Sequence, residues 1–116
     1  MKTTRKQAVK KHKFGVDLDV YKTKSKNVGV VHEKVKGGHF EEFYHKKSTF
    51  TYYILKGKGT FYLNRRKIEV GPTDVIVAPP MTKIYFLGNM ELLLITTPAW
   101  QAKYEVHVRD IERKTS

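Results

Sequence analysis

The stretch GGHFEEFYHKKSTFTYYILKGKGTFYLN, residues 37–64, decides the fold expected for this chain. Aromatic and aliphatic residues recur at alternate positions in it, and this alternation is typical of strands that bury one face. Glycines at 37–38 and at 57–59 let the chain turn. By the alternation, the residues that share the inner side of two consecutive strands are Phe43 and His45, then Phe50, Tyr52 and Ile54.

Runs of the same kind continue on both sides of this stretch. Roughly nine short strands fit between turns of glycine, proline and asparagine, and no window shows a sustained helical repeat. Ile84 and Phe86 add to the inner set by the same alternation. So many strands in 116 residues predict one all-β domain, a sandwich or a closed barrel. Cysteine is absent, so we expect neither a disulfide nor a thiolate metal site.

Positive charge gathers at the beginning of the chain, whose formal net charge is +12. We expect residues 1–13 to form a basic arm that is mobile or loosely docked, residues 14–110 to form the barrel, and residues 111–116 to form a tail. No apolar run is long enough for a signal peptide or a membrane span, which favours a cytoplasmic location and no membrane partner. The basic residues of the arm are Lys2, Arg5, Lys6, Lys10, Lys11 and Lys13.

The spacing of residues 37–57 resembles the first motif of the cupin superfamily, whose pattern is G-x5-H-x-H-x3,4-E-x6-G. The pattern falls on Gly37, Phe43, His45, Phe50 and Gly57. Both glycines and the second histidine are in register, whereas phenylalanine stands at the first histidine and at the glutamate. The resemblance implies a double-stranded β-helix, the jelly-roll barrel of that superfamily.

A second segment, TDVIVAPPMTKIYFLG at 73–88, resembles the second cupin motif, G-x5-P-x-G-x2-H-x3-N, more weakly. Pro79 keeps its place, other residues replace the glycines at 73 and 81, and Ile84 occupies the histidine position. Three of the four metal ligands that the resemblance implies are therefore apolar side chains, which offer no lone pair to a metal. We predict a metal-free barrel without a cofactor.

The predicted ligand pocket centres on His45, the remaining member of the ligand set. This histidine is either buried with both ring nitrogens bonded, or it orients a ligand and acts as an acid or base. In an enzyme, Tyr52 or Tyr44 would be its partner acid, and Trp100 is either a packing lid or a platform for the ligand. The predicted pocket residues are Phe43, His45, Phe50, Tyr52, Ile84, Phe86 and Trp100.

A displaced metal site is a separate hypothesis. It would use His32, His39 and a glutamate, Glu41 or Glu42, although such residues are more often ordinary surface groups.

Three functions stay open at this point. The first is a metal-free module that binds a sugar-like or anionic small molecule. The second is a metal-independent sugar isomerase, epimerase or lyase that uses His45 and Tyr52. The third is a binder of polyanions or nucleic acid that uses the basic arm. Edge strands of such barrels often pair, so a homodimer is also expected.

Overall fold

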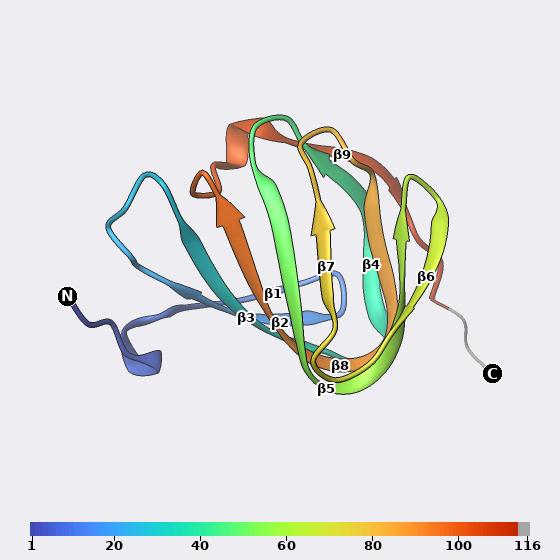
Figure 1. Ribbon diagram of the computed structural model, residues 1–116, viewed down its shortest axis with the longest axis horizontal. Helices are drawn as coiled ribbons and strands as arrows, with labels where there is room; N and C mark the ends of the chain where they lie inside the picture. The colour runs from blue at the N-terminus through green and yellow to red at the C-terminus, as the bar shows by residue number, and fades with distance from the viewer. Residues whose placement is uncertain (114–116) are drawn as a thin grey trace.

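Two long strands run through the whole barrel and bend with it (Figure 1). β5 (Thr49–Leu63) and β8 (Ile84–Thr97) pair antiparallel over their entire length, with a register shift near the middle of β5. Gly57 follows that shift with a φ of 83°. A Cβ at Gly57 would collide with the Asn89 carbonyl oxygen, so glycine is required. The glycines at 57–59 therefore bend one continuous strand, where the sequence predicted a turn between two.

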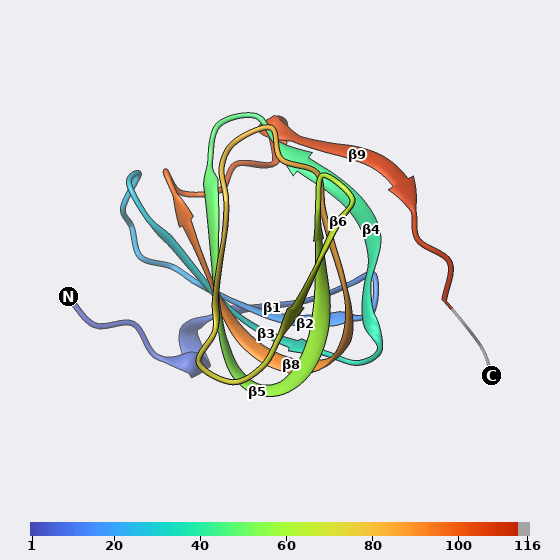
Figure 2. The ribbon, with the colours of Figure 1, turned by 45° about the vertical axis from the view of Figure 1, so that its right-hand side comes forward.

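The remaining strands extend this pair on both sides to make one curled antiparallel sheet of nine strands. The computed structural model describes residues 1–113 of the chain. One path through the sheet runs β1-β2-β3-β8-β4-β9, and β5 pairs with β6, β7 and β8 (Figures 1 and 2). The other strands are β1 (Val9–Lys13), β2 (Val16–Tyr21), β3 (Gly29–Val35), β4 (Gly38–His45), β6 (Arg66–Val70), β7 (Val75–Ala78) and β9 (Glu105–Asp110).

Helical structure in the described chain is limited to two short 3-10 turns. These are η1 (Arg5–Gln7) and η2 (Ala102–Tyr104). Between residues 1 and 113, no helix is long and apolar enough to cross a membrane. The prediction of an all-β jelly-roll barrel is confirmed.

Aromatic rings from the two long strands pack against one another in the interior of the barrel. Phe61 of β5 stacks on Phe86 of β8 with ring centroids 4.6 Å apart, and Tyr52 meets Phe61 edge-on at 4.9 Å. These rings are almost fully buried, so they contribute a large share of the hydrophobic stabilisation. Apolar side chains from β3, β4, β6 and β7 surround them.

The beginning of the chain differs from the arm that the sequence predicted. Val9–Lys13 forms β1, which pairs antiparallel with β2, and the barrel boundary expected at residue 14 falls inside the turn of this hairpin. Most β1 side chains are exposed, as on many edge strands, so no buried alternation marks the strand in the sequence. Arg5 and Lys10 bind Asp19 of β2 at 3.1 and 2.9 Å.

The expected tail begins at residue 111 and lies partly outside the described residues. Residues 111–113 have no regular secondary structure, although the Ile111 amide donates to the Phe40 carbonyl oxygen at 2.9 Å. Residues 114–116 lie outside the described part of the chain.

Deleting residues 1–13 should lower the melting temperature by roughly 5 °C or more, because β2 loses its pairing partner. Deleting only residues 1–8 should change it by no more than about 2 °C, because exposed ion pairs such as Arg5 with Asp19 contribute little. Thermal unfolding followed by circular dichroism compares the two forms. Equal melting temperatures for the two deletions would show that β1 does not stabilise the barrel.

Candidate functional site

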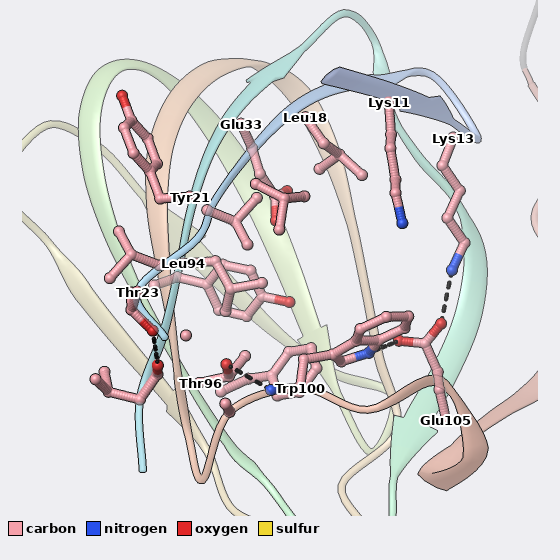
Figure 3. Close-up of a pocket in the computed structure, with 18 of the residues that line it drawn as sticks. Lys11, Lys13, Leu18, Tyr21, Thr23, Glu33, Leu94, Thr96, Trp100 and Glu105 are labelled. Atoms are coloured by element: carbon pink, nitrogen blue, oxygen red, sulfur yellow. Dashed lines mark hydrogen bonds and ion pairs between the residues drawn. The ribbon is translucent and has the colours of Figure 1, made fainter. Parts of the chain in front are cut away.

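A central cavity of about 340 Å³ lies inside the barrel beneath β1, β2 and β3 (Figure 3). Its wall is mostly apolar, with a few polar groups placed among rings and aliphatic side chains, as in many small-molecule sites. Most of the lining comes from strands, which hold side chains in fixed positions. The lining residues used below are Lys13 of β1, Leu18 of β2, Glu33 of β3, His39 and Phe43 of β4, Phe50 and Tyr52 of β5, Phe86 of β8, and Trp100 and Glu105.

His39 is a buried histidine that enters this cavity from β4. Its ring lies 5.1 Å from that of Phe43 and 5.3 Å from that of Phe86, between centroids. Nδ1 is 3.0 Å from the Glu41 carbonyl oxygen, which only accepts, so Nδ1 carries the proton of the neutral ring. Burial lowers the pKa of His39, although the Glu41 carbonyl and nearby carboxylates oppose the effect. At neutral pH, Nε2 therefore has a free lone pair.

An ion pair between Lys13 and Glu105 stands in the same cavity. Lys13 Nζ donates to Glu105 Oε2 at 2.6 Å, and the Trp100 indole N–H donates to Glu105 Oε1 at 2.9 Å (Figure 3). Burial alone would lower the pKa of Lys13, but the bond to Glu105 and the surrounding carboxylates outweigh it and raise that pKa. Lys13 is therefore a fixed cation, and Glu105 joins it to the Trp100 ring.

Glu41 lies close to both Lys13 and His39. Its Oε2 pairs with His107 Nδ1 at 2.8 Å, while its Oε1 is 3.6 Å from Lys13 Nζ and 3.9 Å from His39 Nε2. Within residues 1–113, Oε1 is the side-chain atom that is fully enclosed by protein and lacks a hydrogen-bond partner. A proton gained by His39 would thus find a carboxylate oxygen nearby, which favours the charged ring.

Tyr52 and Glu33 bring two further ionisable groups to the cavity, and both are neutral at neutral pH. Burial raises the pKa of the Tyr52 hydroxyl well above its usual value. Burial also raises the pKa of Glu33 to about 8; Lys13 opposes this and Glu105 adds to it.

The structure brings five of the seven predicted pocket residues to the cavity. These are Phe43, Phe50, Tyr52, Phe86 and Trp100. Ile84 is buried on β8 but does not line the cavity.

His45 also lies outside the cavity lining, at the end of β4. It is 2% exposed; its Nδ1 accepts from the Ser48 amide at 2.9 Å and from the Lys47 amide at 3.2 Å. Its Nε2 donates to the Gln101 carbonyl oxygen at 3.1 Å. Both nitrogens are therefore used to hold two loops, which matches the structural interpretation of this residue.

The residues at the cupin metal positions do not fit a metal. Phe43, Phe50 and Ile84 have no donor atom, and both His45 nitrogens are bonded to the backbone. The displaced site is not assembled either, because His32 bonds Glu91 at 3.1 Å while His39 bonds the Glu41 backbone. No group of three or more possible ligands occurs among the described residues.

Four polar residues of the cavity are not predicted as pocket residues from the sequence. The sequence predicts His39 only as a ligand of the displaced metal site and Lys13 only as part of the basic arm, and it assigns no role to Glu33 or Glu105. For two of them, the local sequence pattern indicates an inward-facing side chain. His39 is an even number of residues from Phe43 on the same strand, and Glu33 lies between Val31 and Val35 on an inner face. Lys13 and Glu105 meet across 92 residues, which no local pattern indicates.

Replacing His45 by glutamine should lower the free energy of unfolding by about 1–3 kcal/mol, because at least one of its backbone partners loses a hydrogen bond. Ligand affinity should stay the same, because His45 is outside the cavity. Urea unfolding and a ligand titration of the variant measure the two quantities. Lost affinity in a stable variant would return His45 to the binding site.

Replacing Glu33 by glutamine should change how stability depends on pH. The unfolded chain loses the Glu33 proton near the ordinary pKa of 4.5, whereas the native protein keeps it until about 8. The native state of the wild type is therefore progressively destabilised as pH rises through this window, on the order of a few kcal/mol. Glutamine does not titrate, so the variant should gain stability relative to wild type between pH 5 and 8, measured by urea unfolding. A constant difference would mean that Glu33 is ionised in the native state.

Comparison with known proteins places this arrangement in a family. No family model matches the chain. A curated relative, an uncharacterized protein of Methanocaldococcus jannaschii, is 42% identical over 53 residues, which are 44% of this chain and 42% of that protein. This match therefore spans less than half of the relative.

Solved structures match over almost the whole chain. Pac13, a nucleoside dehydratase, is 40% identical with a TM-score of 0.95, covering 97% of this chain and 94% of Pac13. Variants of the Streptomyces protein, with a tyrosine replaced by phenylalanine or a histidine by glutamine, were solved with uridine.

More distant matches support the fold alone. KdgF from Halomonas is 15% identical with a TM-score of 0.75, covering 89% of this chain and 97% of KdgF. Oxalate decarboxylase from Bacillus subtilis is 16% identical with a TM-score of 0.76, covering 90% of this chain and 31% of that one. With its jelly-roll barrel and its full-length likeness to Pac13, this chain belongs to the cupin superfamily and, within it, to the family of that protein.

Proposed function

We propose that this chain is a metal-independent lyase that removes water from a nucleoside, with His39 as the general base. The observation that carries the proposal is the cavity in which a neutral His39 and the Lys13–Glu105 pair meet among aromatic rings. The 40% identity to a nucleoside dehydratase over 97% of the chain supports the substrate class. Of the functions that the sequence left open, this is the lyase, with the base moved from His45 to His39.

Dehydration needs a base that takes a proton from carbon and an acid that returns one to the leaving oxygen. Nε2 of His39 takes the proton, the C–H electron pair forms the carbon–carbon double bond, and the C–O bond breaks. The imidazolium then protonates the departing hydroxide, which leaves as water and restores neutral His39. Imidazole removes such a proton readily only beside a carbonyl group. The expected substrate is therefore a nucleoside whose sugar carries an aldehyde or ketone.

Lys13 and Glu105 suit the other half of this chemistry. Negative charge develops on the carbonyl oxygen as the proton leaves carbon, and a fixed cation in an apolar cavity stabilises that charge strongly. Lys13 is such a cation, positioned by Glu105 at 2.6 Å. Glu105 also holds the Trp100 ring at the wall of the cavity, where it can pack against the ligand.

The variants of the Streptomyces protein support a role for His39 and Tyr52 in acting on the nucleoside. In that protein, the substituted histidine precedes one substituted tyrosine by 13 residues. His39 precedes Tyr52 by the same spacing, and both line the cavity.

One departure favours a second candidate function, nucleoside binding without turnover. The other substituted tyrosine of the Streptomyces protein follows the first by 34 residues. At that spacing after Tyr52 this chain has Phe86, which lacks the hydroxyl group. The protein would then retain the binding site of its relative with a reduced catalytic set.

Incubation with uridine derivatives oxidised on the sugar, in D2O, separates the two candidates. A lyase yields a product lighter by one water by mass spectrometry, and His39→Gln should lower the rate at least about 100-fold. Uridine affinity should stay within a few-fold of wild type, because the variant keeps the cavity. Because burial lowers the pKa of His39, wild-type activity should persist as pH falls below its ordinary value of 6.5.

His45→Gln is the matched control, since it makes the same chemical change outside the cavity and should leave the rate unchanged. Uridine binding without any loss of water or deuterium exchange would support the binding module instead. A His39→Gln variant with wild-type turnover would remove His39 as the base.

A further inference from the structure

Glu33 is a buried acid that the proposed reaction does not use. It lies on the inner face of β3 between Val31 and Val35, is 4% exposed, and lines the central cavity. Figure 3 shows it beside Leu18, on the side of the cavity away from Glu105. Most glutamates are exposed unless they are paired, so this position calls for a partner.

The described part of the chain offers Glu33 no such partner. In the sheet, Glu33 lies between Leu18 of β2 and Leu92 of β8, whose side chains cannot form hydrogen bonds. From residue 1 to residue 113, no hydrogen bond or ion pair reaches its carboxyl group. A buried carboxyl group that opens on a cavity and lacks a partner is a ready site for a polar group of a ligand.

Several of the other titratable groups around the cavity are already engaged. Lys13 and Glu105 bond each other, and His39 bonds the Glu41 backbone. The titratable groups that line the cavity with Glu33 are Lys11 and Lys13 of β1, Tyr21 of β2, Lys24 of the loop after β2, His39 of β4, Tyr52 of β5 and Glu105.

The protonation state of Glu33 decides what it can recognise. With a pKa of about 8, its carboxyl group is neutral at pH 7 and presents one O–H donor beside one C=O acceptor. A ligand edge with an acceptor beside a donor forms two parallel hydrogen bonds with it. A ligand edge with two donors would instead require the ionised carboxylate.

We propose that Glu33, as a neutral carboxylic acid, binds the nucleobase by the N–H and C=O groups of its imide edge, as found in uracil. This inference rests on the proposed function, because it assumes a nucleoside in the cavity. The base then occupies the side of Leu18 and Glu33, and the sugar reaches His39, Lys13 and Glu105. Glu33 is thus a specificity-determining residue, separate from the groups that move protons.

Uridine and 3-methyluridine, titrated calorimetrically into the whole protein, test this. Methylation removes the N–H donor, so 3-methyluridine should bind the wild type at least about tenfold more weakly than uridine. Glu33→Leu should lose about the same factor for uridine. Glu33→Gln keeps one donor beside one acceptor, so its affinity for uridine near pH 6.5 should stay within a few-fold of wild type.

The pH dependence separates recognition from packing. Between about pH 6.5 and about pH 8.5, wild-type affinity for uridine should fall several-fold relative to Glu33→Gln, because only Glu33 loses its donor. Glu91→Leu on the outer face of β8 is the matched control and should bind like the wild type. Melting temperatures of all variants show whether each one is folded, and Glu33→Gln keeps the test valid if the leucine variant unfolds.

Each failure has a distinct signature. A wild type that binds no uridine overturns the proposed function and this inference with it. Uridine binding by the wild type that is unaffected by Glu33→Leu or by methylation of the base overturns the role of Glu33 alone. A parallel pH dependence of wild type and Glu33→Gln overturns recognition by the neutral acid.

Discussion

The structure depends on the continuous pairing of β5 with β8. This ladder brings Phe61 onto Phe86 and sets Tyr52 against both, so the most buried rings of the barrel come from its two longest strands. Phe50 and Tyr52, two buried rings of β5, also form part of the cavity wall. Core and site therefore share residues, and the hydrophobic effect that folds the barrel also gives the cavity its shape.

The sequence was sufficient for the fold and for part of the cavity wall. Alternation predicted an all-β domain and four residues of that wall, Phe43, Phe50, Tyr52 and Phe86, because burial on one strand face is a local property. The resemblance to the cupin motifs predicted the jelly roll. The same alternation applies to His39 and Glu33, but the resemblance to the cupin motifs predicts the site at His45 instead. Hydrogen bonds from Ser48 and to Gln101 decide that His45 holds loops, and those contacts depend on tertiary structure. Long-range pairs such as Lys13 with Glu105 were beyond prediction for the same reason.

The polar groups of the cavity differ in their charge at neutral pH. Burial keeps His39, Tyr52 and Glu33 uncharged, while the hydrogen bond to Glu105 raises the pKa of Lys13 and keeps it charged. An ion pair and uncharged titratable groups thus lie within one small volume. Such groups can both move a proton and bind an uncharged ligand. These are the two tasks that the proposed dehydration of a nucleoside with a neutral nucleobase requires.

One member of this set, Lys13, is carried by an edge strand. Among residues 1–113, β1 pairs only with β2, and its side chains are mostly exposed, so it is a weakly held part of the barrel. Local opening of such a strand costs less free energy than global unfolding. When β1 detaches, Glu105 and Glu41 lose their shared cation while the aromatic core stays intact. On warming, the protein is therefore expected to pass through a folded state whose cavity has lost Lys13, so the temperature range in which the cavity stays assembled is set by the least stable strand rather than by the core.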